Sequence, residues 1–130
     1  MAESQKTILV LEDERPLLEA IKKKLEISGF AVLSARSVEQ AIEYLKDVGD
    51  IAVIWLDHYL LGKENGLDFV TRMKGNEEWK KIPIFVVSNT ASPDKMTSYI
   101  ELGVDKYYTK ADYRLDQIIA DIQISLQESK

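Results

Sequence analysis

The sequence of 130 residues contains no cysteine, one histidine and only three prolines. Without cysteine, neither a disulfide framework nor a thiolate metal site can form. The apolar runs are far shorter than the roughly 20 residues that a membrane-spanning helix needs. Residues 1–7 are polar and lack the apolar centre of a signal peptide. We therefore expect a cytoplasmic protein that makes no membrane contact.

Basic residues are outnumbered, with 17 Lys and Arg against 22 Asp and Glu and a net charge of −5. This balance argues against a nucleic-acid backbone as a direct partner. The hydrophobic share of 45% and the charged share of 30% are typical of a soluble globular protein. The length suits one domain with a full core, so residues 1–130 are expected to form a single domain.

Five short apolar segments, each followed by an amphipathic stretch, predict strands and helices that alternate along the chain. Parallel strands need crossover helices, and these crossovers are right-handed. The pattern therefore predicts an α/β fold: a doubly wound, flavodoxin-like, five-stranded parallel sheet with strand order 2-1-3-4-5 and helices on both faces. The strands are expected near residues 7–11, 30–35, 51–57, 84–88 and 106–109.

Several single residues carry local predictions. Ser37 and Gln40 have the spacing of a capping box at a helix start. Asp112 is expected to cap the final helix. Trp55 is expected in the core, whereas the lone histidine, His58, is expected to be an exposed loop side chain.

Asp57 follows a run of six apolar residues, where packing of a core gives no reason for an acid. The carboxyl ends of parallel strands share one edge, and open α/β sheets place their ligands there. Glu12 and Asp13 end the first strand, so three carboxylates are expected to meet at this edge. A divalent cation would relieve their repulsion, and Mg²⁺ prefers oxygen ligands. Ser88 and Lys110 bring a hydroxyl and a positive charge to the same edge.

This arrangement resembles the receiver domain of two-component response regulators, and the resemblance covers nearly the whole chain. Four segments carry it: LVLED ending at Asp13, IWLD ending at Asp57, VVS ending at Ser88 and YYTK ending at Lys110. Each segment alone is weak. All four at the ends of the expected strands form a specific signature.

The resemblance implies a role for each residue of the cluster. Asp57 would be the phosphoacceptor, Ser88 the hydroxyl that moves to meet the phosphoryl group, and Lys110 the charge that pairs with it. Tyr107 occupies the position of an aromatic switch. The implied ligands of Mg²⁺ are Glu12, Asp13, Asp57 and the backbone carbonyl of Tyr59.

The implied function is a signalling switch, not an enzyme beyond its own phosphoryl transfer and dephosphorylation. The phosphoryl donor would be a histidine kinase or a histidine phosphotransfer protein. The surface that changes on activation would be the last strand and its flanking helices, which carry Tyr99, Tyr107 and Tyr108. This surface would bind a downstream protein target or a second copy of the chain.

Two other functions fit parts of the sequence. A receiver-fold interaction module that does not need phosphate shares every motif. An aspartyl phosphohydrolase is disfavoured, because the dehalogenase-like pattern needs an acid two residues after the nucleophile, where this chain has Tyr59.

The sequence also departs from the family pattern. Ala111 replaces the proline that usually follows Lys110. A cis bond before a residue other than proline costs about 2.5–4 kcal/mol, so the Lys110–Ala111 bond is predicted to be trans. Tyr59 and Thr90 lie at two variable positions that, in this family, tune the lifetime of the phosphoryl group.

Overall fold

The computed structural model describes residues 5–89 and 92–128, and in these ranges five strands alternate with five helices. Each strand is short and apolar, and each helix carries its apolar residues on one side, as the sequence pattern predicts. In chain order the elements are β1 (Thr7–Leu11), α1 (Arg15–Ile27), β2 (Ala31–Ala35), α2 (Val38–Asp47), β3 (Ile51–Leu56), α3 (Gly66–Lys74), β4 (Ile84–Ser88), α4 (Pro93–Glu101), β5 (Lys106–Thr109) and α5 (Leu115–Glu128).

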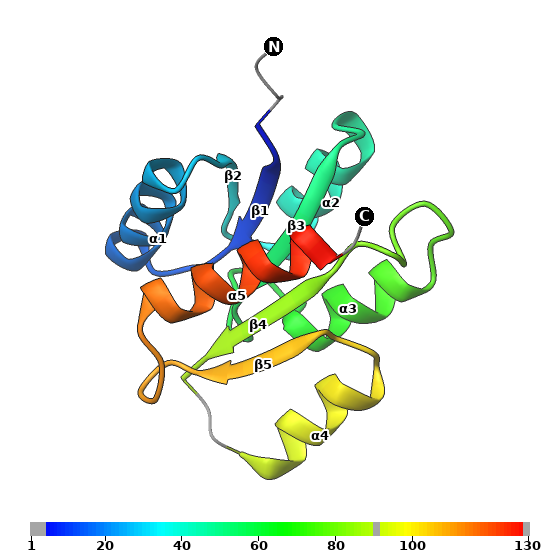
Figure 1. Cartoon of the computed structure of the whole chain (residues 1–130). Helices are drawn as coiled ribbons and strands as arrows, with labels where there is room; N and C mark the ends of the chain where they lie inside the picture. Colours follow the sequence, from blue (N-terminus) through cyan, green and yellow to red (C-terminus); the bar gives the residue numbers. More distant parts are fainter. Residues whose placement is uncertain (1–4, 90–91, 129–130) are drawn as a thin grey trace.

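The strands form one parallel sheet in the order β2-β1-β3-β4-β5, which confirms the predicted doubly wound fold (Figure 1). β1 and β3 therefore lie side by side at the point where the strand order reverses, although they are separated in sequence by β2. β3 ends at Leu56, so Asp57 is the first residue beyond the central strand. β2 begins at Ala31, one residue after the predicted start.

Side chains that alternate along the strands build two apolar layers, one on each face of the sheet. On β1, Ile8 and Val10 pack with α1 and α5, whereas Leu9 and Leu11 pack with α2, α3 and α4. Trp55 lies in the first layer and is fully buried, as predicted. Full burial of one such side chain contributes about 1.5–3 kcal/mol, so both layers fix the strands and the loops at their ends.

The predicted capping box at α2 forms only in part. The Ser37 hydroxyl accepts a hydrogen bond from the backbone N–H of Gln40 at 3.1 Å. The Gln40 side chain, however, accepts from the N–H of Arg36 at 2.9 Å rather than from that of Ser37. A complete capping box occurs instead at α3, between Asn65 and Asp68.

The prediction that Asp112 caps the last helix is wrong. The N–H of Asp112 donates to the carbonyl of Thr109 at 3.0 Å, which closes a turn directly after β5. α5 begins three residues later, at Leu115, where the side chain of Gln117 accepts a hydrogen bond from the N–H of Arg114. The turn uses the residues that the sequence pattern had assigned to the helix start.

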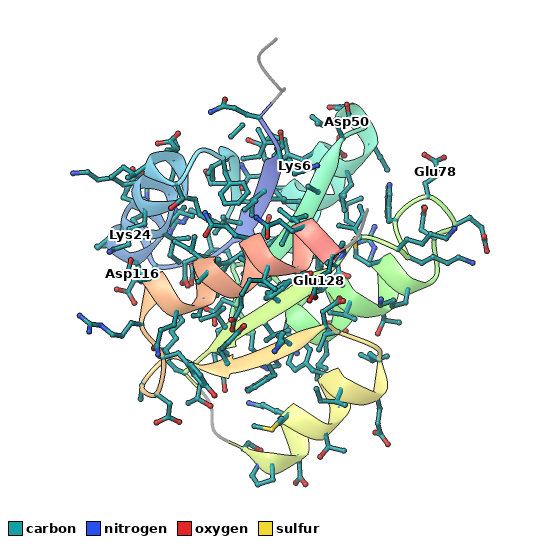
Figure 2. The ribbon with its side chains drawn as sticks, viewed as in Figure 1. Lys6, Lys24, Asp50, Glu78, Asp116 and Glu128 are labelled. Carbon is teal, nitrogen blue, oxygen red and sulfur yellow. The ribbon has the colours of Figure 1, made fainter. Side chains whose placement is uncertain are left out.

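An ion pair joins the two helices that cover one face of the sheet. Lys24 of α1 and Asp116 of α5 lie side by side at a distance of 2.9 Å (Figure 2). Both side chains are exposed, so the pair contributes little to stability. None of the helices in the described ranges is both long and apolar enough to cross a bilayer.

Candidate functional site

Asp57 lies at the carboxyl edge of the sheet, held by its own backbone and by that of the next residue. Its N–H donates to the carbonyl of Leu11 at the end of β1, at 2.9 Å. The N–H of His58 donates to the Asp57 Oδ1 atom, also at 2.9 Å. Only 5% of Asp57 is exposed, so its carboxylate is fixed in a largely dry position.

Glu12 and Lys110 reach the same point from the ends of β1 and β5. The Lys110 Nζ atom lies 2.9 Å from the Glu12 Oε1 atom and 3.7 Å from the Asp57 Oδ1 atom. The N–H of Lys110 donates to the carbonyl of Ser88 at 2.8 Å, which places the lysine beside the end of β4. No peptide bond in the described ranges is cis, so the trans prediction for Lys110–Ala111 is confirmed. The trans bond still lets the ammonium reach Asp57.

The electrostatic balance of this cluster is negative. Burial raises the pKa of Asp57 from 3.8 to about 7, and the nearby Glu12 carboxylate adds to this rise. The Lys110 ammonium and the His58 N–H act in the opposite direction. One ammonium faces two buried carboxylates, so the negative charge of the cluster is only partly neutralised. This excess negative charge favours binding of a further cation.

Asp13 does not join the other two acids, which differs from the expectation that all three meet. Its backbone carbonyl accepts a hydrogen bond from the Nε atom of Arg36 at 3.1 Å, and its Oδ1 atom lies 3.4 Å from the Arg36 Nη2 atom. In the part of the chain that the structure describes, no three acidic or histidine side chains are close enough to hold one metal ion. Asp13 is paired instead with Arg36, which no motif of the sequence marks.

Ser88 and Tyr107 connect the acid cluster with β5. Ser88 is fully buried at the end of β4, and Tyr107 on β5 is half-buried. Burial raises the pKa of Tyr107, and a hydrogen bond with Ser88 opposes this rise. Tyr107 on β5 therefore interacts with the Ser88 side chain at the end of β4.

His58 is buried, and the prediction of an exposed loop side chain is wrong. Only 4% of His58 is exposed, and its Nδ1 atom lies 2.7 Å from the hydroxyl oxygen of Tyr99 on α4. Burial lowers the pKa of His58. Gly66 makes this contact possible, because a Cβ atom at that position would collide with the Tyr99 hydroxyl. A glycine at the first position of a helix was the one signal in the sequence for this contact.

The tyrosines expected on the output surface are mostly inside the protein. Tyr99 is fully buried among the residues of α2, α3 and α4, and Tyr108 is buried on the opposite face of the sheet. The Tyr108 hydroxyl donates to Asp121 of α5 at 2.7 Å. Tyr99 and Tyr108 therefore fix α4 and α5 to the sheet and are not available to a partner.

Tyr59, in the loop after Asp57, is exposed and turned toward α4. Its hydroxyl accepts a hydrogen bond from the Lys95 Nζ atom at 2.7 Å, and that ammonium also lies 4.8 Å from the centre of the ring. Thr90, the second position associated with phosphoryl lifetime, lies outside the described residues.

Comparison with known proteins agrees with this geometry. Residues 8–124 match the family described as the response regulator receiver domain. The phosphate regulon transcriptional regulatory protein PhoB of Pseudomonas aeruginosa is 33% identical over 105 residues, which are 81% of this chain and 45% of PhoB. The transcriptional regulatory protein CpxR of Escherichia coli is 29% identical over 94% of this chain and 50% of its own length. The chain thus spans about half the length of the curated relatives it matches.

Solved structures share the fold. The Mn²⁺-bound form of response regulator Rcp1 is 25% identical, with a TM-score of 0.76 over 91% of this chain and 89% of its own. Since the family match covers most of the chain and carries the acid cluster with it, the protein belongs to the response regulator receiver domain family.

Proposed function

We propose that Asp57 is the phosphoacceptor of this receiver domain. Proteins of this family are signalling switches that take up a phosphoryl group. The observation that carries the assignment is the position of Asp57: buried at the carboxyl end of the central strand, against Glu12, and 3.7 Å from the ammonium of Lys110. The pKa of Asp57 is strongly raised by burial, which is typical of a carboxylate at a functional site.

The proposed step is an attack by a carboxylate oxygen of Asp57 on the phosphorus of a phosphohistidine. A P–O bond forms, the P–N bond breaks, and the leaving imidazole takes a proton from solvent. The donor would be a histidine kinase or a histidine phosphotransfer protein. Lys110 supplies a positive charge for the new phosphoryl group, and the His58 N–H holds the carboxylate in place. Hydrolysis of the acyl phosphate would then reset the switch.

The charge and the oxygen donors of the site suit Mg²⁺, provided that Asp13 leaves its ion pair with Arg36. A divalent cation would neutralise the excess negative charge around Asp57 and Glu12. All the groups that could bind it are oxygen donors, which Mg²⁺ prefers. Glu12, Asp13, Asp57 and the backbone carbonyl of Tyr59 are the groups that would hold it. When bound, Mg²⁺ neutralises charge on the phosphoryl group during transfer. The Mn²⁺-bound form of Rcp1, a relative of similar fold, supports a divalent cation site.

The switch would operate through Ser88. A phosphoryl group on Asp57 offers new hydrogen-bond acceptors to this hydroxyl, which now bonds with Tyr107. Loss of that partner would release the Tyr107 ring. The ring centres of Tyr107 and Tyr99 are 5.7 Å apart, so a movement of Tyr107 on β5 would also change the packing of α4.

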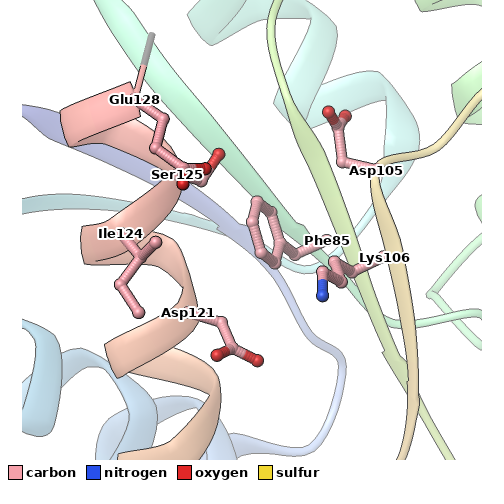
Figure 3. A pocket seen from close by; sticks show the side chains of 7 residues that line it. All are labelled: Phe85, Asp105, Lys106, Asp121, Ile124, Ser125 and Glu128. Carbon is pink, nitrogen blue, oxygen red and sulfur yellow. The ribbon is translucent and has the colours of Figure 1, made fainter.

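The proposed output surface consists of α4, β5 and α5. Two isoleucines on it are about half exposed, Ile100 on α4 at 52% and Ile124 on α5 at 51%. We propose that this surface binds a downstream protein target, with a second copy of the chain as the alternative partner. A pocket opens on it between the sheet and the end of α5 (Figure 3), lined by Phe85, Asp105, Lys106, Asp121, Ile124, Ser125 and Glu128.

Phosphorylation can be tested by the intact mass of the protein after incubation with acetyl phosphate. We expect one phosphoryl group on the wild type when Mg²⁺ is present, none without Mg²⁺ and none on Asp57→Asn. Asp116→Asn, which changes an exposed acid on α5, is the matched control and should label like the wild type. Equal labelling of Asp57→Asn and the wild type would refute the assignment. No labelling of any protein would favour a phosphate-independent interaction module.

The output surface can be tested with beryllofluoride and Mg²⁺, which together imitate the phosphoryl group. We expect amide signals of α4, β5 and α5 to shift together with those around Asp57. Size-exclusion chromatography of the same sample distinguishes a second copy from a different protein as the partner. Shifts confined to the loops beside Asp13, Asp57 and Ser88 would show that this surface is not coupled to the site.

A further inference from the structure

Arg36 follows β2 directly and is fixed between two loops of the site. Its N–H donates to the side chain of Gln40 at 2.9 Å, and its carbonyl accepts from the N–H of Leu61 in the loop after Asp57, also at 2.9 Å. A parallel bridge between Ser37 and Leu61 adds to this support. The backbone of Arg36 is therefore anchored to both α2 and the β3–α3 loop.

The guanidinium of Arg36 holds Asp13 at two atoms. The Nε atom donates to the backbone carbonyl of Asp13 at 3.1 Å, and the Nη2 atom lies 3.4 Å from the Oδ1 atom. A planar guanidinium donates to two acceptors at once, which fixes the direction of the acid as well as its charge. The Asp13 carboxylate is thereby held beside Arg36, the residue that follows β2.

Glu12 and Asp13, the first two of the three acids that follow β1, are thus each paired with a cation. Lys110 pairs with Glu12 and also reaches Asp57, so its charge already lies at the phosphorylation site. Arg36 pairs with Asp13 alone. A cation that binds among all three acids must separate Asp13 from Arg36 and must also tolerate the positive charge that remains nearby. Both effects oppose binding of a metal ion.

We propose that Arg36 lowers the affinity of the acidic site for Mg²⁺ by competing with the ion for Asp13. Arg36 is thus a positioning residue that sets how much Mg²⁺ the chain needs before Asp57 can be phosphorylated. The inference rests on the proposed function, because it assumes that Asp13 contributes to a Mg²⁺ site. The Arg36 and Asp13 side chains are about one-third exposed, so water and the ion can reach the pair.

Isothermal titration calorimetry with Mg²⁺ alone, without any phosphoryl donor, tests the proposal. We expect Arg36→Gln to bind Mg²⁺ about 3- to 10-fold more tightly than the wild type, from loss of a partly exposed ion pair and of a nearby like charge. Arg72→Gln is the matched control. It removes an arginine of similar exposure from an ion pair with Glu64 on the chain surface, and should bind Mg²⁺ like the wild type.

A second comparison isolates the Asp13 contact. In an Asp13→Asn background we expect the further change Arg36→Gln to alter Mg²⁺ affinity by less than it does in the wild type, because the competition has been removed. Circular dichroism of each variant confirms that the fold is kept.

The possible results of the titrations distinguish a wrong role for Arg36 from the absence of a Mg²⁺ site. Unchanged or weaker Mg²⁺ binding by Arg36→Gln, with normal binding by the wild type, overturns the inference and leaves the metal site intact. Weaker binding would mean that Arg36 orients Asp13 for the ion. An absence of Mg²⁺ binding by every variant overturns the inference together with the metal site. If Arg36→Gln and Arg72→Gln gain Mg²⁺ affinity equally, the gain is due to net charge alone. That result also overturns the inference.

Discussion

Substitution of Asp57 by asparagine should stabilise the protein at neutral pH, although it removes the proposed phosphoacceptor. The pKa of Asp57 is about 7 in the folded chain, against an ordinary value of 3.8. Because the folded value is the higher one, the contribution of Asp57 to stability is fully present below about pH 4 and is lost as the pH rises toward 7. At about 1.4 kcal/mol per pH unit, this loss amounts to about 4 kcal/mol. Asparagine has nearly the same shape and does not ionise.

The assay is urea unfolding of the wild type and Asp57→Asn from about pH 4 to about pH 8, with divalent cations removed by a chelator. We expect the stability of Asp57→Asn relative to the wild type to grow across this range. Asp116→Asn is the control of opposite sign, because the Lys24 ammonium lowers the pKa of Asp116. A difference between Asp57→Asn and the wild type that does not change with pH, or that favours the wild type above pH 7, would refute the reasoning. It would show that Lys110 fully offsets the burial of the Asp57 carboxylate.

Two further predictions concern the neighbours of Asp57. Lys110→Ala removes the ammonium that lowers the pKa of Asp57, so we expect that pKa to rise further; carboxyl chemical shifts followed by NMR during a pH titration check this, and an unchanged value would contradict it. Tyr99→Phe leaves the buried Nδ1 atom of His58 without this partner and should destabilise the fold by about 1–3 kcal/mol in urea unfolding. Tyr108→Phe, which also loses one hydroxyl bond of 2.7 Å, is its matched control, and we expect a smaller loss because its partner is only partly buried.

The sheet and the centre of the site could be predicted because they depend on patterns within single segments. Apolar runs mark the strands, and the rule that parallel strands share a carboxyl edge brings Glu12, Asp57 and Lys110 together without further information. These are contacts that the strand order alone decides. The same rule placed Ser88 beside them, at the end of β4.

The errors concern side chains whose partners lie on another element. Burial of His58 depends on Tyr99, 41 residues later in the chain, and the direction of Asp13 depends on Arg36, 23 residues later. No periodicity in the sequence reports such pairs. The predicted start of α5 is wrong for a local reason. Asp112 favours a turn as well as a helix cap, and in the structure it forms the turn.

That turn has a consequence for how the protein could be re-engineered. Residues 111–114 separate Lys110 from the first residue of α5, so the position of the lysine is set by its backbone bond to Ser88 and not by the helix. The exposed residues of α5 could therefore be exchanged for those of another regulator while the lysine stays at the acid cluster. A chimaera of this kind would keep phosphorylation at the acid cluster and bind a different partner protein.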